Sequence, residues 1–303
     1  MDKGLLLKSK LPHIASTIFS KMSALANEHN AINLSQGFPN FNVDPKLIEL
    51  VNKHMEKGKN QYAPYTGINE LREVLSEQVY KDHDHFFDPQ NEVNICAGAT
   101  QAIATAITAS IEKGDEVILF SPAYDCYAPY IELNGGIPVF IELEFPSYSI
   151  DWEKVKAKIS SKTKMIIINS PHNPSATTLK KNDLLNLEEI CENSKILILA
   201  DEVYEHIIFD GQKHNSICSR PKLASRCFLI GSLGKTLHIT GWKMGFCMAP
   251  KDLMKEFRKV HQFMVFSVNT PMQYALAEYL REDANFRISK MYQGKRDVFL
   301  KAI

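Results

Sequence analysis

Seven short apolar runs, separated by longer amphipathic stretches, constrain the fold of this 303-residue chain most strongly. They span residues 92–96, 116–120, 137–141, 165–168, 196–200, 228–231 and 245–249. Each has the length of a buried strand, whereas Ile103, Ile107 and Ile111 recur every fourth residue within 101–111, as on one buried face of a helix. Nearly continuous hydrophobic strands joined by helices predict an α/β fold, with a mostly parallel seven-stranded sheet sandwiched by helices.

The same pattern predicts the domain organisation. Residues 1–41 are expected to form an N-terminal arm with a helix, and residues 42–285 one large domain without repeats or linkers. The pattern turns helical again at Arg287 and stops at Ile303 without a glycine cap or a proline. We therefore expect 286–303 to begin a C-terminal small domain that is cut short.

Charge and cysteine usage narrow the class of protein. Lysine plus arginine number 35 and aspartate plus glutamate number 35, which gives no electrostatic reason to expect a nucleic acid or an anionic membrane as partner. No apolar stretch approaches the length needed to span a bilayer. The six cysteines show no C-x-x-C spacing and mostly lie in apolar runs, so we expect them to be reduced core residues of a cytoplasmic protein.

The segment 231–236 (GSLGKT) follows an apolar strand and ends like a phosphate-binding loop for nucleoside triphosphates. Such a loop needs glycine where this chain has Leu229, and a long helix after the lysine. The segment 240–242 (TGW) interrupts any such helix, so the nucleotide interpretation is disfavoured. Instead, Lys235 is expected to be partly desolvated, with Lys243 as a nearby cation, and both effects lower an amine pKa and favour attack on an aldehyde.

Polar residues at other strand ends suggest the rest of a cofactor site. Asp201 ends a fully apolar strand, where burying a carboxylate is costly unless it meets a cation such as a protonated pyridine nitrogen. Tyr204 and Asn173 are suited to donate hydrogen bonds to a phenolate oxygen. Tyr124 could stack on a planar ring, although a tyrosine in such a place is more often packing.

The segment 97–101 (AGATQ) joins a strand end to a helix start. Its free N–H groups and the Thr100 hydroxyl could cradle a phosphate, or Thr100 could be an ordinary helix N-cap. In the polar segment around His83 and His85, we expect solvated side chains and no metal site.

Taken in order, these motifs resemble the class I aminotransferases of fold type I, which use pyridoxal 5′-phosphate (PLP). The resemblance runs from about Ile32 to the end, through GAT, AY, NP, DEVY, SLGK and GWK. Further motifs are most similar to the methionine and kynurenine (glutamine) aminotransferase branch: SQGFP at 35–39, QYAPY at 61–65, DCY at 125–127, VHQ at 260–262 and VNTP at 268–271.

The resemblance implies a role for each matching residue. Lys235 corresponds to the lysine that holds PLP as a Schiff base, and Asp201 to the partner of the pyridinium. Asn173 and Tyr204 correspond to residues that bind the ring oxygen, and Tyr124 to one that stacks on the ring. The expected catalytic residues are thus Lys235, Asp201 and Tyr204. The expected PLP-binding domain spans residues 42–285.

The remaining positions implied by the resemblance bind the phosphate and the substrate. The phosphate ligands would be Ala99, Thr100, Ser232, Lys243 and, from the second subunit of a homodimer, Tyr62. Gly37 and Asn173 would line the pocket for the substrate.

Two departures from the family pattern stand out. Ala176 occupies a position where the family usually has glycine, so we expect this turn to avoid a positive φ angle. The family's arginine for the substrate α-carboxylate has no counterpart, since Arg281, Arg287 and Arg296 do not match its motif.

The resemblance implies an enzyme that moves the amino group of an L-amino acid to a 2-oxo acid. Methionine, glutamine, kynurenine and other aromatic amino acids are the expected donors. Two alternatives stay open: a C–S β-lyase acting on cysteine conjugates, and a fragment that binds PLP but is catalytically impaired.

Overall fold

A seven-stranded sheet forms the centre of the computed structural model, which describes residues 8–14, 17–37, 39, 41–282 and 288–303. The strands are β1 (Val93–Cys96), β2 (Glu116–Ser121), β3 (Ile137–Glu142), β4 (Thr163–Asn169), β5 (Leu197–Asp201), β6 (Cys227–Ser232) and β7 (Gly245–Met248). Their order in the sheet is β1-β7-β6-β5-β4-β2-β3. Only β7 runs antiparallel to its neighbours, β1 and β6. The predicted α/β class and mostly parallel sheet are confirmed.

Helices connect the strands and cover the sheet. They are α1 (Ile18–Glu28), α2 (Pro45–Glu56), α3 (Asn69–His83), α4 (Ala99–Ser110), α5 (Tyr127–Leu133), α6 (Trp152–Lys158), α7 (Lys181–Glu192), α8 (Pro221–Ala224), α9 (Leu233–Thr236), α10 (Lys251–Met264), α11 (Thr270–Glu282) and α12 (Ile288–Ala302). Two 3-10 turns, η1 (Ile217–Ser219) and η2 (Thr240–Trp242), lie in the connections.

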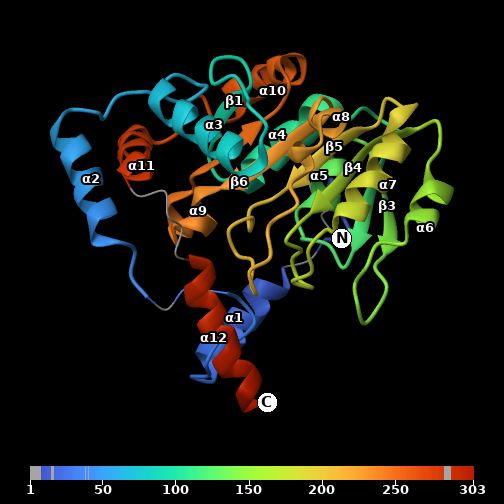
Figure 1. The fold of residues 1–303 in the computed structure, drawn as a ribbon, viewed down its shortest axis with the longest axis horizontal. Coiled ribbons are helices and arrows are strands. Elements are labelled where there is room, and N and C mark those ends of the chain that lie inside the picture. The colour runs from blue at the N-terminus through green and yellow to red at the C-terminus, as the bar shows by residue number, and fades with distance from the viewer. Residues whose placement is uncertain (1–7, 15–16, 38, 40, 283–287) are drawn as a thin grey trace, which may run out of the picture.

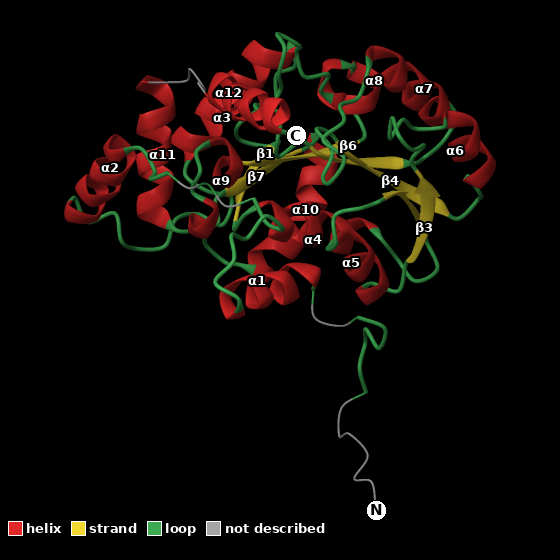
Figure 2. Cartoon of the chain, turned by 90° about the horizontal axis from the view of Figure 1, so that it is seen from below, coloured by secondary structure: helices red, strands yellow, loops and turns green. Residues whose placement is uncertain are grey.

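Two helical layers lie on opposite faces of the sheet, as Figure 2 shows. Helices α4, α5 and α10 pack on one face, and α6, α7 and α8 on the other. Successive strand residues point to opposite faces, so Ile166 joins one core and Ile167 the other. Two buried faces explain why the central strands β4, β5 and β6 are hydrophobic at most positions.

The two ends of the chain contribute helices outside these layers. In Figure 1, α1 (blue) and α12 (red) lie below the sheet, and α1 has no buried residue. The expected domain boundary at 285/286 and Arg287 lie outside the described residues. Within the described part of the chain, no helix is both long and apolar enough to cross a bilayer.

Candidate active site

The carboxyl ends of β4, β5 and β6 bring polar residues to one edge of the sheet, among them the predicted Asp201 and Ser232. Asn169 ends β4 beside Asp201, which ends β5, and Ser232 ends β6. The side-chain amide of Asn169 donates to the Asp201 carbonyl at 2.8 Å. Parallel strands therefore place these groups together although up to 63 residues separate them, and this edge is where open α/β sheets bind ligands.

Asp201 has a buried carboxylate, and one of its two oxygens lacks a hydrogen-bond donor among the described residues. Its residue is 3% exposed, its Oδ2 accepts a hydrogen bond from the Tyr127 hydroxyl at 2.5 Å, and its Oδ1 has no partner among the described residues. Burial raises the pKa of Asp201 to about 6, against the opposing effects of Tyr127, the Val203 N–H and Lys235. The free Oδ1 is thus suited to a cationic N–H donor.

Tyr127 is a site residue that the sequence did not predict. It begins α5 on one face of the sheet and is fully buried, and burial together with the charge of Asp201 raises its pKa well above the usual value. It therefore remains a phenol that donates its proton to Asp201. The motif at 125–127 contains it, but a tyrosine in a helix start gives no sign of its partner 74 residues away.

Lys235 lies in the four-residue helix α9, directly after β6. Its Nζ is 5.3 Å from the centroid of the Tyr204 ring. Burial lowers its pKa, as predicted, while the charge of Asp201 opposes the shift. The predicted contribution of Lys243 to this shift is wrong, because Lys243 approaches Gly98 instead.

The side chain of Lys243, which follows η2, lies at the start of α4 next to Gly98. Gly98 is the N-cap of α4 with φ of 84°, and a Cβ added there would lie 3.2 Å from Lys243 Nζ. A Cβ on Gly245 would lie 2.8 Å from the backbone nitrogen of Ala99. Lys243 itself has φ of 55°, which turns its side chain back over the helix start. Free helix N–H groups and an ammonium group together suit an anion.

Thr100 does not cap this helix. The N-cap is Gly98, without a side-chain capping bond, so the alternative of an ordinary Thr100 cap is wrong. Instead, the Thr100 hydroxyl forms a hydrogen bond with Tyr124. Tyr124 is half-buried and packs edge-on against Tyr127, with ring centroids 5.7 Å apart.

Asn173 and Tyr204 line a cavity of 630 Å³ next to these strand ends. The backbone N–H of Asn173 donates to Asn169 Oδ1 at 2.8 Å, which fixes the loop after β4. Burial raises the pKa of Tyr204, and the charge of Asp201 adds to the effect. Its hydroxyl therefore keeps the proton that a hydrogen-bond donor needs.

Two predicted residues lie apart from this group. Tyr62 is 80% exposed and packs edge-on against Phe266 at 5.1 Å. Gly37 is exposed, and a Cβ there would meet nothing within 4 Å. A single chain does not bring either residue to Lys235.

Two described arginines do not match the family's carboxylate-binding motif, and both pair with acidic side chains. Arg281 contacts Glu73 at 3.3 Å, and Arg296 forms two hydrogen bonds of 2.7 Å to Asp210. Neither guanidinium lies free beside Lys235.

The expectation for Ala176 is wrong. Its φ is 59°, so the turn keeps the left-handed conformation despite the side chain. Two backbone hydrogen bonds of 2.8 Å hold it there, from Ala176 N to the His172 carbonyl and from His172 N to the Thr177 carbonyl. The turn geometry is imposed by these bonds rather than by the residue type.

Replacing Ala176 with glycine is expected to raise the free energy of unfolding by roughly 0.5–1 kcal/mol. Glycine removes the strain of the left-handed conformation, which stabilises the folded state. This gain is larger than the stabilisation of the unfolded chain by the extra flexibility of glycine. Urea unfolding measures the change. Ala128→Gly in α5, where the backbone is helical, serves as the control and should lower stability by about 1 kcal/mol; a drop for both variants would refute strain at Ala176.

The expectation of solvated histidines is also wrong for His83. Its side chain is 7% exposed and lies 2.9 Å from Glu205. His85 packs against Phe87, with ring centroids 4.6 Å apart. The polar local sequence conceals this burial because the partner of His83 comes from the segment after β5.

Comparison with known proteins identifies the class. A family model described as aminotransferase class I and II matches residues 29–301, and the chain belongs to this family. It is 44% identical over 304 residues to methionine aminotransferase of Escherichia coli K12, covering 100% of this chain and 79% of that protein. It is 34% identical over 283 residues to human kynurenine–oxoglutarate transaminase 1, covering 88% of this chain and 67% of that protein.

Solved structures agree with this assignment. Escherichia coli YbdL, described as having a methionine aminotransferase function, superimposes with a TM-score of 0.95 at 45% identity, over 98% of this chain and 78% of that chain. N-succinyldiaminopimelate aminotransferase of Mycobacterium tuberculosis gives a TM-score of 0.93 at 33% identity, over 97% and 78%. The chain is an amino-acid aminotransferase, of a family that depends on PLP.

Proposed function

We propose that this aminotransferase binds PLP at the ends of β4, β5 and β6 and uses Lys235 to move the substrate α-proton. The observation that carries the proposal is the buried Asp201 Oδ1, which has no hydrogen-bond partner among the described residues. Asp201 ends β5, and Lys235 follows the neighbouring strand β6. A buried carboxylate oxygen without a donor is costly. The protonated ring nitrogen of PLP is the donor that fits it.

The other residues around the site fit the rest of the cofactor. Tyr204 and Asn173 line the adjoining cavity and can donate to the ring oxygen, and Tyr124 would stack on the ring. At the other end, Ala99, Thr100, Ser232 and Lys243 would hold the phosphate. The added Cβ at Gly98 would reach Lys243 Nζ, so glycine there keeps the phosphate pocket open.

Bound there, PLP supplies an electrophilic aldehyde and an electron-withdrawing ring. Burial lowers the pKa of Lys235 and so increases the fraction of neutral amine available to attack and to accept a proton. With the cofactor bound, Lys235 Nζ would accept the proton from the substrate α-carbon and hold it for the return transfer. Asp201 would keep the ring nitrogen protonated, and the Tyr127 hydroxyl, which donates to Oδ2, orients the Asp201 carboxylate.

Replacing Tyr127 with phenylalanine tests this orientation. Its hydroxyl lowers the pKa of Asp201, so its loss should raise that pKa. Because Asp201 acts in its ionised form, the acidic limb of the kcat/KM profile should move to higher pH, by about one unit for a hydrogen bond to a charged group. An unchanged acidic limb would show that Tyr127 does not tune Asp201. Tyr130→Phe, on the same helix, is the matched control.

Replacing Lys243 with alanine should weaken PLP binding by roughly 10- to 100-fold, the worth of one charged hydrogen bond. Titration of the visible absorbance measures the affinity. Pyridoxal, which lacks the phosphate, should bind the variant and the wild type equally, and Lys251→Ala should resemble the wild type. Equal loss of both ligands would place Lys243 outside the phosphate site.

We also propose that the active form is a homodimer in which Tyr62 reaches the phosphate of the other subunit and Gly37 lines the substrate pocket. Large apolar side chains cluster on the exposed surface near Tyr62, with Phe263 87% and Phe266 61% exposed. Surface of this kind favours a protein partner. Mixing inactive Tyr62→Ala and Lys235→Ala subunits should restore part of the activity, because one of the two sites in the mixed dimer is then intact.

The proposed donors are methionine, kynurenine, glutamine and other aromatic L-amino acids, and the acceptor is a 2-oxo acid. The names of the relatives support methionine and kynurenine. Each donor is incubated with the PLP-loaded protein and a 2-oxo acid, and the new 2-oxo acid is measured. Pyruvate and ammonia from a cysteine conjugate, without a 2-oxo acid acceptor, would instead indicate the β-lyase alternative.

A further inference from the structure

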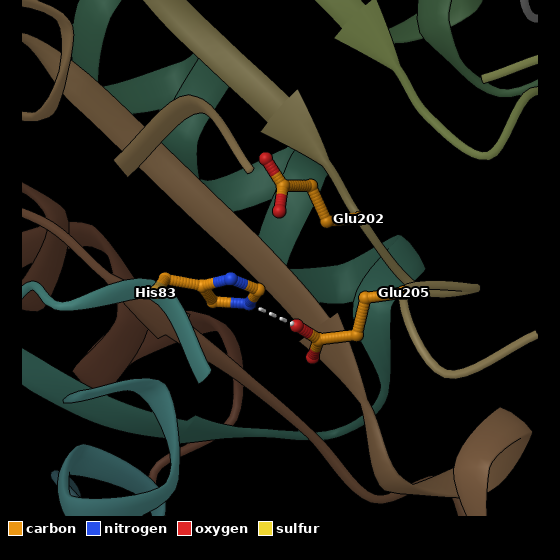
Figure 3. Close-up of side chains that lie close together, drawn as sticks. All are labelled: His83, Glu202 and Glu205. Atoms are coloured by element: carbon orange, nitrogen blue, oxygen red, sulfur yellow. Dashed lines mark hydrogen bonds and ion pairs between the residues drawn. The ribbon is translucent and has the colours of Figure 1, made fainter. Parts of the chain in front are cut away.

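A cluster of histidine and glutamate side chains lies around the segment that follows Asp201. Glu202 and Glu205 come from this segment, His83 from the end of α3, and His214 from the connection to η1. Ligand atoms of His83, Glu202 and Glu205 all lie within 4.8 Å of one another. Figure 3 shows the imidazole of His83 facing both carboxylates.

These side chains are buried and contact one another directly. The exposed fractions are 7% for His83, 13% for Glu205, 4% for His214 and 3% for Glu202. His83 Nε2 lies 2.9 Å from Glu205 Oε2, and His214 Nε2 lies 2.6 Å from Glu202 Oε2. The two imidazoles pack edge-on, with centroids 5.7 Å apart. Water therefore has little access to these two carboxylates.

Two buried carboxylates need positive charge, and here histidines surround them. Burial alone would raise the pKa of Glu205, but His206, His83 and His214 lower it to about 2. Burial alone would lower the pKa of His83, but the hydrogen bond and charge of Glu205 raise it overall. The neighbouring histidines thus favour the ionised form of Glu205. A divalent cation would supply the same charge from one atom.

One atom of the cluster lacks a partner. His214 Nδ1 has no hydrogen bond among the described residues, although its side chain is nearly fully buried. The other side of the cluster is well ordered, since the backbone N–H of Ile217 donates to Glu202 Oε1 at 2.8 Å. This contact fixes the carboxylate, as outer contacts do in metal sites, while Oε2 of Glu202 faces His214.

We propose that His83, Glu205, Glu202 and His214 form a Zn²⁺ site. Two imidazole nitrogens and two carboxylate oxygens are a ligand set that suits Zn²⁺, whereas Ca²⁺ and Mg²⁺ prefer oxygen alone. Ligand atoms of His83, Glu202 and Glu205 already lie within 4.8 Å of one another, and His214 Nε2 joins them through its 2.6 Å contact with Glu202 Oε2. Four bonds of about 2.0–2.2 Å require these side chains to move toward a common centre. Binding of the ion requires the imidazole nitrogens to be free of protons. Protons released on binding go to solvent, so affinity falls as pH falls.

The site links elements far apart in the chain. His83 and Glu205 are 122 residues apart. The ion would tie α3 to the segment that carries Asp201 and Tyr204, and so would stabilise the fold where both side chains are positioned. Binding does not depend on the proposed aminotransferase mechanism.

The test is a titration of the PLP-loaded, chelator-treated protein with ZnCl₂, followed by calorimetry in two buffers of different ionisation enthalpy. The expected result is one Zn²⁺ per chain with release of protons. His83→Asn should weaken binding by at least roughly 100-fold, the upper end of the loss caused by removing an outer contact alone. His85→Asn, two residues away and packed on Phe87, should bind like the wild type.

Further readouts separate this site from other zinc ligands. Co²⁺ should give the visible absorption of a tetrahedral site in the wild type and in His85→Asn but not in His83→Asn, and both variants should keep their PLP absorbance. If His83→Asn fails to fold, Glu205→Gln replaces it with the same expectation. Absence of Zn²⁺ binding by the wild type, or equal binding by a folded His83 or Glu205 variant, would overturn the proposal.

Discussion

Replacing Lys235 with alanine is expected to lower the rate of transamination by at least about 10⁴-fold, the upper range for losing a general base, because the same amine also holds the cofactor. The side chain lies after β6, where burial lowers its pKa. Lys243, eight residues later, approaches Gly98 instead. Steady-state formation of the 2-oxo acid product from methionine measures the effect.

Two controls distinguish the loss of an amine from the loss of the fold. Lys251→Ala, at the exposed start of α10, should have wild-type activity. A small primary amine added to the solution should restore part of the activity of Lys235→Ala, because it supplies the missing proton acceptor. Activity of Lys235→Ala within tenfold of the wild type would place the chemistry on another residue.

Replacing Asp201 with asparagine is expected to lower kcat by about 10²–10³-fold, the loss typical of removing one preorganised electrostatic partner. Asparagine keeps the shape of the side chain and an oxygen that can accept the hydrogen bond from Tyr127. It lacks the negative charge that holds a ring nitrogen protonated. Rapid mixing with saturating methionine separates the chemical step from binding.

The affinity of Asp201→Asn for PLP should change much less than its rate, because the substitution leaves the proposed phosphate site at Gly98 and Lys243 unchanged. Asp252→Asn, exposed in the first turn of α10, is the matched control and should have no effect. A rate for Asp201→Asn within a few-fold of the wild type would mean that Oδ1 of Asp201 does not face the cofactor.

The sheet and the strand-end residues could be predicted because local sequence determines them. A strand buried on both faces needs apolar side chains at every position, so Asp201 stands out as a polar end. Parallel pairing then brings Asp201 beside Asn169 without any further information. The antiparallel direction of β7 had no such signal, since its burial resembles that of its neighbours.

The missed features all depend on contacts between distant segments. Tyr127 meets Asp201 only when α5 packs on the sheet. His83 lies in a polar segment but becomes buried against Glu205. Ala176 adopts a positive φ because of two backbone hydrogen bonds. Lys243 turns toward Gly98 because of its own left-handed backbone. Neither the period of hydrophobic residues nor the spacing of motifs predicts these contacts and backbone conformations.

The most direct test of the account is to locate the covalently bound cofactor. The PLP-loaded protein is reduced with borohydride and digested, and mass spectrometry identifies the peptide that carries the added pyridoxyl phosphate group. Lys235 is expected to carry this group, Lys235→Ala should remove it, and prior addition of methionine should prevent the labelling. Labelling of another lysine, or labelling of Lys235 that methionine leaves unchanged, would refute the role of Lys235.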